Sequence, residues 1–170
     1  MKKGFLVALS AIIADQVHKY IMIYVIGMAK FTLNDLPVIK SGASTIEVTP
    51  FFNLVMVWNR GVSFGMFNRG EIQAYQPLLL IILSLVIVLA LVRWLKKTTV
   101  QIQIWGLGLI IGGALGNVID RAIYGAVADF FDFHLREMHW PAFNIADSCI
   151  CIGVVILVVE SFVDKRIKKS

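Results

Sequence analysis

Charged residues are scarce in this chain. Asp, Glu, Lys and Arg make up 16% of its 170 residues, against about 25% in an average soluble domain. Apolar residues make up 58%, and the mean hydropathy is +0.79. This composition argues against disorder and against a water-soluble domain. The net charge of +5 could suggest nucleic acid, but the cations flank apolar blocks without interleaved aromatics, so we expect no nucleic-acid binding.

Cysteine is also scarce, since the chain holds only Cys149 and Cys151. Two residues apart on a helix, they project about 200° from one another, which suits neither a disulfide nor a metal site. We therefore expect buried free thiols. His18, His134 and His139 are not spaced as a ligand set, and no Cys-x-x-Cys motif occurs. The sequence predicts no metal and no cofactor.

The apolar residues form blocks long enough to cross a bilayer, which takes about 20 residues. Four spans are predicted, at residues 4–28, 72–92, 100–119 and 142–159. The expected fold class is an all-α membrane protein, a four-transmembrane-helix bundle in a single integral membrane domain over residues 1–170.

The first span has a rival interpretation, because residues 5–14 after two lysines resemble a cleaved signal peptide. However, apolar sequence resumes at Tyr20. Asp15 and Lys19 lie at i and i+4, so they can pair on one helix face instead of facing lipid singly. We favour a continuous span with Asp15 and Lys19 as a structural pair.

Cations flank the spans unevenly, and this asymmetry predicts orientation. Six cations are spread over the two longer connections, whereas the denser groups lie at the two termini and in the short second connection. Both termini are therefore predicted to be cytoplasmic. The residues that define the cytoplasmic side are Lys2, Lys3, Arg93, Lys96, Lys97, Lys165, Arg166, Lys168 and Lys169.

The first outer connection, of about forty residues, is too long for a simple turn. Residues 46–49 alternate in polarity, and residues 52–58 are rich in β-branched and aromatic types before a turn at residues 59–61. We predict a small extracytoplasmic β element at about residues 45–68. Five aromatic residues there are expected either at headgroup level or lining a lipid-binding groove: Phe51, Phe52, Trp58, Phe64 and Phe67.

Small residues recur in the third span, where Gly108, Gly112 and Gly116 lie four apart. Such a stripe allows another helix to approach closely, because helix association in lipid depends on packing. At the end of this span, Asn117 and Arg121 lie at i and i+4. Arg121 could snorkel to the interface or hold a carboxylate or lipid headgroup, and Asp120 adds charge beside it.

Asp147 is the most conspicuous polar residue at membrane depth, where ionisable groups are costly. Asn144, three residues earlier, is expected on the same helix face and can hydrogen-bond this carboxyl group or a ligand. Asp129 approaches from the preceding connection. Two carboxyl groups brought together share a proton, and then one can act as general base on water while the other donates to a carbonyl oxygen.

The spacing alone does not identify the partner of Asp147. Asp15, Asp120 and Asp132 compete with Asp129 for that position. Intramembrane carboxylates also serve proton relays and structural pairs. A small proton-coupled membrane transporter or channel subunit, with Asp15, Lys19 and Asp147 as its relay, is therefore the alternative function. Against it, most of the ionisable groups gather at one face.

Five short motifs occur in order along nearly the whole chain. They are Asp15-Gln16-x-x-Lys19, Asn59-x-Gly61-Val62-Ser63-Phe64-Gly65, Gly112-Gly113-Ala114-x-Gly116-Asn117-x-x-Asp120-Arg121, Val127-x-Asp129-Phe130 and Phe143-Asn144-x-Ala146-Asp147. In this combination the chain resembles the bacterial lipoprotein signal peptidases, also called signal peptidase II, which are membrane aspartic proteases. Two residues depart from the usual pattern: His18 replaces a small residue, and Val62 replaces Ala.

The resemblance implies a four-helix bundle with a small extracytoplasmic β cradle and a short surface helix. It implies an enzyme of the bacterial inner membrane that cleaves diacylglyceryl-modified prolipoproteins just before the lipidated cysteine and is inhibited by the peptide antibiotic globomycin. The family's catalytic aspartates fall on Asp129 and Asp147. Its substrate-binding or dyad-supporting residues fall on Asn59, Gly61, Asn117, Arg121 and Asn144. The expected partners are the lipid-modified substrate and membrane lipid, with the enzyme itself a monomer.

Overall fold

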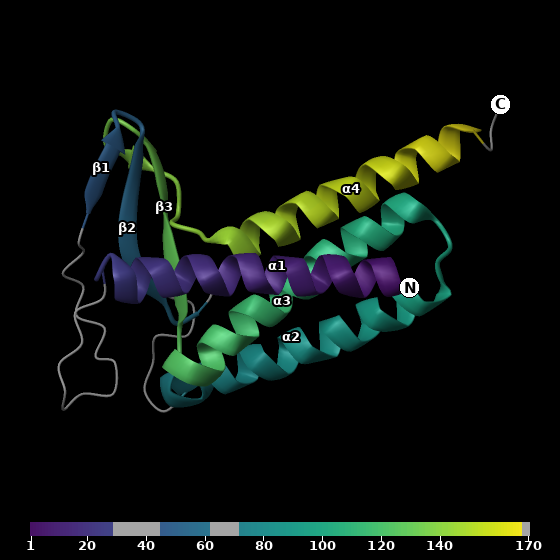
Figure 1. Ribbon diagram of the computed structural model, residues 1–170, viewed down its shortest axis with the longest axis horizontal. Coiled ribbons are helices and arrows are strands. Elements are labelled where there is room, and N and C mark those ends of the chain that lie inside the picture. Colours follow the sequence, from purple (N-terminus) through teal and green to yellow (C-terminus); the bar gives the residue numbers. More distant parts are fainter. Residues whose placement is uncertain (29–44, 62–71, 168–170) are drawn as a thin grey trace. The chain divides into compact units, whose positions relative to one another are not determined.

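Four long helices dominate the computed structural model, which describes residues 1–28, 45–61 and 72–167 (Figure 1). They are α1 (Lys2–Tyr20), continued by the π-helix η1 (Ile21–Val25), α2 (Ile72–Lys97), α3 (Gln101–Tyr124) and α4 (Ile145–Ile167). Each contains a segment long and apolar enough to cross a membrane. The four predicted spans are confirmed, although α2, α3 and α4 continue beyond the predicted ends and α4 begins three residues later than expected.

The surfaces of α2 and α4 explain the high apolar content. Only 11% of the most apolar window of each helix is buried inside the protein. Leu78, Leu83, Val155 and Val159 are among the large apolar side chains that are more than half exposed. Such a density of exposed aliphatic side chains fits contact with hydrocarbon.

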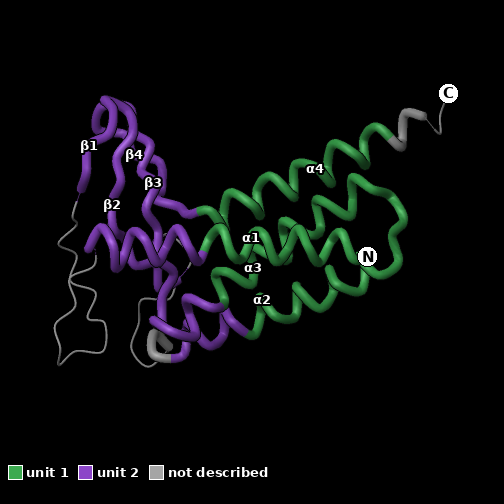
Figure 2. The backbone as a smooth tube through the Cα atoms, viewed as in Figure 1, with its two compact units in different colours: residues 1–15, 82–118, 145–170 green, residues 16–81, 119–144 purple. Residues whose placement is uncertain are grey.

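The described chain forms two compact units, coloured separately in Figure 2. Unit 1 comprises residues 1–15, 82–118 and 145–170, and unit 2 comprises residues 16–81 and 119–144. The boundaries fall inside α1, α2 and α3, so these helices contribute to both units.

Unit 1 is built by close helix packing around α3. A side chain at Gly108 would meet the Gly4 carbonyl oxygen at 2.7 Å, and one at Gly112 would meet the Ala8 carbonyl oxygen at 2.5 Å. On another side of α3, a side chain at Gly106 would meet the Gly153 carbonyl oxygen at 3.0 Å. The predicted role of the glycine stripe is confirmed, because its missing side chains admit the backbone of a neighbouring helix. The apolar core beside it consists of Ala8, Val88, Leu95, Ile104, Leu107 and Ile111.

Unit 2 contains an antiparallel sheet in the order β1-β2-β3-β4, and Figure 1 shows its first three strands side by side. The strands are β1 (Ile46–Thr49), β2 (Phe52–Asn59), β3 (Val127–Leu135) and β4 (Met138–His139). The predicted strands of the first outer connection are confirmed. The rest of the predicted β element, with Phe64, Phe67 and Val62, lies outside the described residues.

β3 and β4 come from the other outer connection, where no strand was predicted. Residues 127–130 of β3 are all buried, so the strand lacks the alternation that identifies a half-buried strand in a sequence. Its aromatic residues were the available signal. The short surface helix implied by the resemblance is not among the elements of residues 1–28, 45–61 and 72–167.

The core of unit 2 joins η1 to the sheet. Met22 and Ile23 pack in one buried cluster with Met56 of β2 and Phe130 of β3. His18 lies against the same strand, with its ring centroid 5.4 Å from that of Phe130. The sheet is thereby anchored to the end of the first span.

Candidate active site

The carboxylate of Asp129, on β3, is held by two side-chain amides. Asn59 Nδ2 donates to Oδ2 at 3.2 Å, and Asn144 Nδ2 donates to Oδ1 at 2.7 Å. Asp129 is 1% exposed and Asn144 is fully buried. Burial of a charged group is costly unless donors compensate it, and amide donors to both oxygens do so. The structure thus brings Asn59, Asn144 and Asp129 together as the resemblance implies.

Backbone contacts fix the orientation of both amides. The Oδ1 atom of Asn59 accepts a hydrogen bond from the Gly61 backbone N–H at 3.1 Å, which directs its Nδ2 toward Asp129. A side chain at Gly61 would collide with the side chain of Gln76. Gly61 therefore allows the turn after β2 to pack closely while its N–H positions Asn59.

The segment before Asn144 is joined to β3. Phe143 accepts hydrogen bonds from the backbone N–H groups of Phe130 and Phe131 and donates one to the Phe131 carbonyl at 3.2 Å. Asn144 itself also donates to the Ala128 carbonyl oxygen at 3.3 Å. Asn144 lies immediately before α4, which begins at Ile145, and the expectation that it shares a face with Asp147 stays a prediction.

Asp147 lies in the first turn of α4 and is partly buried. Asn117 Nδ2 of α3 donates to its Oδ1 at 2.8 Å. The free N–H groups at a helix N-terminus carry partial positive charge, which favours a carboxylate there. Unit 1 therefore supplies Asp147 with a side-chain donor and a favourable helix end.

Asp15 has a structural role at the same helix end. It is fully buried, and its Oδ1 accepts a hydrogen bond from the backbone N–H of Ala146 at 2.9 Å. Ala146 is the second residue of α4, whose N–H has no partner within the helix. Asp15 thus caps α4 from a neighbouring helix. Its predicted pairing with Lys19 stays a prediction.

Lys19 pairs with a residue that the sequence did not identify as its partner. Its Nζ lies 2.7 Å from Oδ2 of Asp120, and both side chains are almost fully buried. Gln16 Nε2 donates to Asp120 Oδ1 at 3.0 Å, and the Ala128 backbone N–H donates to Oδ2 at 3.1 Å. Asp120, expected to add charge beside Arg121 or to compete as the partner of Asp147, is buried and binds groups of α1 and β3 from its place on α3.

Three other aspartates were considered as partners of Asp147, and the structure gives each of them a contact of its own. Asp15 caps α4, Asp120 binds Lys19, and Asp132 lies 2.9 Å from His139 Nδ1. Each rival thus has a structural partner of its own, whereas Asp129 is oriented by neutral amides. Arg121 is partly buried at the end of α3, and its substrate-binding role stays a prediction.

The two cysteines are free, as expected, but they are not buried. Cys149 is half-buried and Cys151 is exposed. Both lie on α4, and only 11% of the most apolar window of this helix is buried, so the expected burial was wrong because little of this helix surface is covered by protein.

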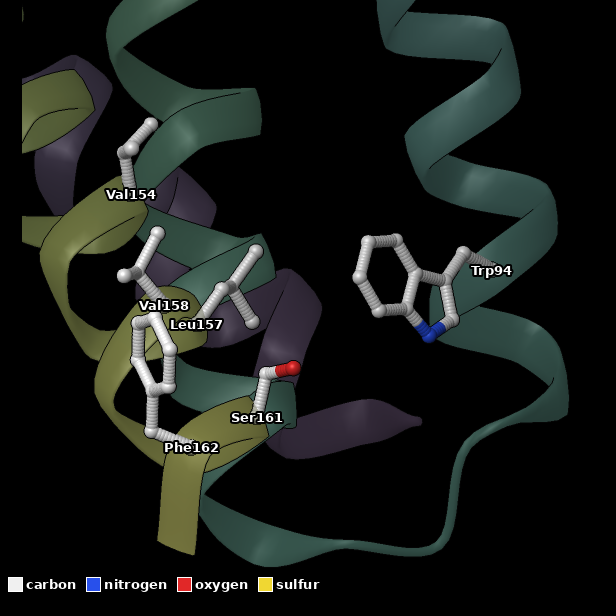
Figure 3. A pocket seen from close by; sticks show the side chains of 6 residues that line it. All are labelled: Trp94, Val154, Leu157, Val158, Ser161 and Phe162. Carbon is white, nitrogen blue, oxygen red and sulfur yellow. The ribbon is translucent and has the colours of Figure 1, made fainter. Parts of the chain in front are cut away.

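Unit 1 also contains an apolar pocket of about 450 Å³ between α2 and α4 (Figure 3). Trp94 of α2 faces Val154, Leu157 and Phe162 of α4 across it. Its lining holds no carboxylate and none of the predicted site residues. A hydrophobic pocket between membrane helices provides no groups for peptide hydrolysis, so it is not the candidate active site.

These features define a multi-pass membrane protein with aspartates supported by amide donors near the ends of its helices. The family model described as Signal peptidase (SPase) II matches residues 7–163. The chain therefore belongs to the signal peptidase II family, the aspartic peptidases that cleave signal peptides from prolipoproteins. This assignment excludes the alternative of a proton-coupled transporter or channel subunit.

Curated relatives and solved structures agree. The chain is 39% identical to a lipoprotein signal peptidase of Nitrobacter hamburgensis over 166 residues, covering 95% of this chain and 93% of the relative. It is 39% identical to one of Rhodopseudomonas palustris, covering 96% and 93%. A solved bacterial membrane enzyme matches 97% of this chain and 90% of its own, with a TM-score of 0.75 and 29% identity. The protein is thus a four-span bacterial membrane enzyme.

Proposed function

We propose that Asp129 and Asp147 are the catalytic pair, and that they hydrolyse the peptide bond just before the diacylglyceryl-modified cysteine of a prolipoprotein. The observation that carries this proposal is the buried Asp129 carboxylate, which receives amide donors from Asn59 and Asn144 on its two oxygens. Asn144 precedes Asp147 by three residues. At about 3.8 Å per residue, the chain keeps their Cα atoms within about 11 Å.

In the proposed reaction one carboxylate removes a proton from water, and the water oxygen bonds to the scissile carbonyl carbon. The other carboxyl group, protonated, donates to the carbonyl oxygen. The tetrahedral intermediate then breaks its C–N bond, and the new amine of the lipidated cysteine takes up a proton from the carboxyl group that acted as base. The cycle needs one proton on the pair, carried by the carboxyl group that donates to the carbonyl oxygen.

The supporting residues act by position. Asn59, Gly61 and Asn144 orient Asp129, and Asn117 orients Asp147. We assign Arg121 to the substrate peptide, because a guanidinium can bind backbone carbonyl groups through several donors at once. We assign Asp15 and Lys19 a structural role, not a catalytic one. Orientation of this kind can contribute several kcal/mol to catalysis.

The membrane setting fits this substrate. A precursor with two acyl chains is confined to the bilayer, so its scissile bond lies near the surface, where the protease must place its acids. We assign the protein to the bacterial inner membrane as a monomer in a single integral domain, with both termini in the cytoplasm and the active site at the extracytoplasmic face. The uneven distribution of cations supports this orientation.

The test is cleavage of a lipid-modified precursor by Asp129→Asn and Asp147→Asn. Each should lose about 10³-fold or more of the activity while accumulating normally in the membrane, because Asn keeps the shape but cannot act as acid or base. Glu160→Gln is the matched control, since Glu160 is a carboxylate of α4 bound by the amide of Gln103 outside the site. It should cleave at the wild-type rate and remain sensitive to globomycin. Wild-type turnover in either Asp variant would contradict the dyad.

A further inference from the structure

The β3–β4 hairpin places three possible metal ligands on one face of the sheet. Leu135 pairs with Met138, so Arg136 and Glu137 alone form the connection, and Arg136 has the positive φ of 54° that such tight turns use. The next pair is His134 opposite His139. Side chains directly opposite in a sheet share a face, and so do residues two apart on one strand. The side chain of Asp132 therefore lies on the same face of the sheet as those of both histidines.

The distances confirm this convergence. His139 Nδ1 lies 2.9 Å from each carboxylate oxygen of Asp132, and His134 Nδ1 lies 3.9 Å from Oδ2. The two imidazole rings stack with centroids 4.9 Å apart. One ligand atom from each of the three residues lies within 4.8 Å of the others. The sequence-based expectation was that His18, His134 and His139 are not spaced as a ligand set. His18 is not in this group, but the hairpin register brings His134 and His139 together with Asp132, which the sequence did not indicate.

The polar atoms of this cluster are incompletely satisfied. Among the described residues, His134 Nδ1 is buried and makes no hydrogen bond. An unsatisfied buried ring nitrogen is costly and calls for an explanation. Asp132 is 7% exposed and is held by Asn53 Nδ2 at 3.4 Å, whereas the side chain of His139 is 52% exposed. The cluster thus combines a fixed carboxylate with an open side through which an ion can enter.

We propose that Asp132, His134 and His139 bind a divalent transition-metal ion, with Zn²⁺ as the best fit. Two imidazoles and one carboxylate are ligands that Zn²⁺ accepts, and three protein ligands leave a fourth position for water. Hard ions such as Mg²⁺ prefer oxygen ligands and are disfavoured. Tetrahedral ligand atoms about 2.1 Å from zinc are about 3.4 Å apart, so the cluster closes around the ion by rotation of the exposed His139 ring.

The ion would act on the sheet and not on the peptide bond. Asp132 and Asp129 are three residues apart on β3, so their side chains project from opposite faces of the strand. A metal bridging His134 of β3 and His139 of β4 would fasten the short β4 strand, which has only two residues. Because the ion binds the folded hairpin, it should stabilise the folded protein by an amount that rises with the logarithm of the free ion concentration above Kd.

The test uses the full-length protein, purified in detergent through a tag without histidine and stripped with a chelator. Calorimetric titration should show one Zn²⁺ per chain for the wild type and little binding of Mg²⁺. His134→Gln and His139→Gln should each weaken Zn²⁺ binding by at least about tenfold. His18→Gln is the matched control and should bind as the wild type does, since His18 packs on Phe130 and Phe131 and is not one of the three cluster residues.

Cobalt supplies a second measurement that does not depend on stability. Co²⁺ should give the visible absorption of a four-coordinate site in the wild type and in His18→Gln, and this absorption should be lost in His139→Gln. Because the side chain of His139 is exposed, its replacement should have little effect on folding. Thermal unfolding of the variant in the presence of chelator checks this expectation. No saturable Zn²⁺ binding, or equal binding by the wild type and both cluster variants, would show that the cluster is only a structural contact between His139 and Asp132 and would overturn the proposal. Loss of metal binding with intact cleavage leaves the proposed dyad untouched.

Discussion

The side chain of Asn144 donates a 2.7 Å hydrogen bond from Nδ2 to Oδ1 of Asp129. Both residues are almost completely buried. Asn144 is the last residue before α4, the helix whose first turn carries Asp147. The amide that positions one of the proposed catalytic acids therefore belongs to the residue immediately before the helix that carries the other.

Replacement of Asn144 should reduce the rate of cleavage. A hydrogen bond to a charged group contributes about 1.5–3 kcal/mol, so Asn144→Ala should lower kcat about 10- to 100-fold, with a smaller change in KM. Single-turnover cleavage of a lipidated precursor measures the chemical step. Gln103→Ala removes a comparable amide donor to a carboxylate, Glu160, outside the site, and should cleave at the wild-type rate. Equal losses in the two variants would contradict a positioning role for Asn144.

The lipid on the substrate should be required. The diacylglyceryl group confines the precursor to the bilayer and contributes about 0.8 kcal/mol per buried CH₂. We therefore expect the unlipidated precursor to be cleaved at least about 10²-fold less efficiently in kcat/KM. Parallel assays on lipidated and unlipidated forms of one precursor measure this ratio. Efficient cleavage of the unlipidated form would remove lipid recognition from the proposal while leaving the dyad intact.

The Lys19–Asp120 pair should be important for stability. Lys19→Met leaves Asp120 charged and buried, and breaking a buried pair in this way costs about 3–5 kcal/mol. Thermal unfolding in detergent should show a large decrease in Tm. The double variant Lys19→Met/Asp120→Asn removes both charges and keeps an acceptor for the Ala128 N–H, so it should be more stable than the single variant. A single variant as stable as the wild type would show that the pair contributes little.

The glycine stripe makes a steric prediction. Gly112→Leu should disrupt the packing of α3 on α1, because even a Cβ there would lie 2.5 Å from the Ala8 carbonyl oxygen, and overpacking costs about 1–3 kcal/mol or more. Ala90→Leu enlarges an exposed position of α2 and serves as the control. Membrane accumulation and thermal unfolding compare the two. Equal stability of both variants would contradict close packing at Gly112.

The predicted orientation can be measured directly. Single cysteines introduced at Ser10 within the first span as a reference, at Thr99 between α2 and α3 and at Trp140 before α4 report which side of the membrane each position faces. After replacement of Cys149 and Cys151, an impermeant thiol reagent applied to intact spheroplasts should label position 140 and leave position 99 unlabelled, since cation-rich connections stay in the cytoplasm. The reverse labelling pattern would invert the proposed topology.

Several features of this protein were determined by the sequence alone. Uninterrupted apolar blocks have few alternatives to spanning helices, because unpaired backbone groups are intolerable in hydrocarbon. The four spans and the glycine stripe were therefore predictable, and the first two strands were visible from their alternation and β-branched content. The ordered motifs were enough to indicate the family, which the comparisons confirm.

The tertiary structure decided which polar groups meet. Asp120 as the partner of Lys19, Asp15 as the cap of α4, and Asn144 as a donor to Asp129 all join residues more than ten positions apart. The sequence did not predict β3, because the strand is buried on both faces around Asp129 and so shows no alternation. The pairing of His134 with His139 depends on the register of the β3–β4 hairpin. Local periodicity records which face of a segment avoids water, whereas pairing between distant segments is fixed only when the chain packs and each buried polar atom must find its donor or acceptor.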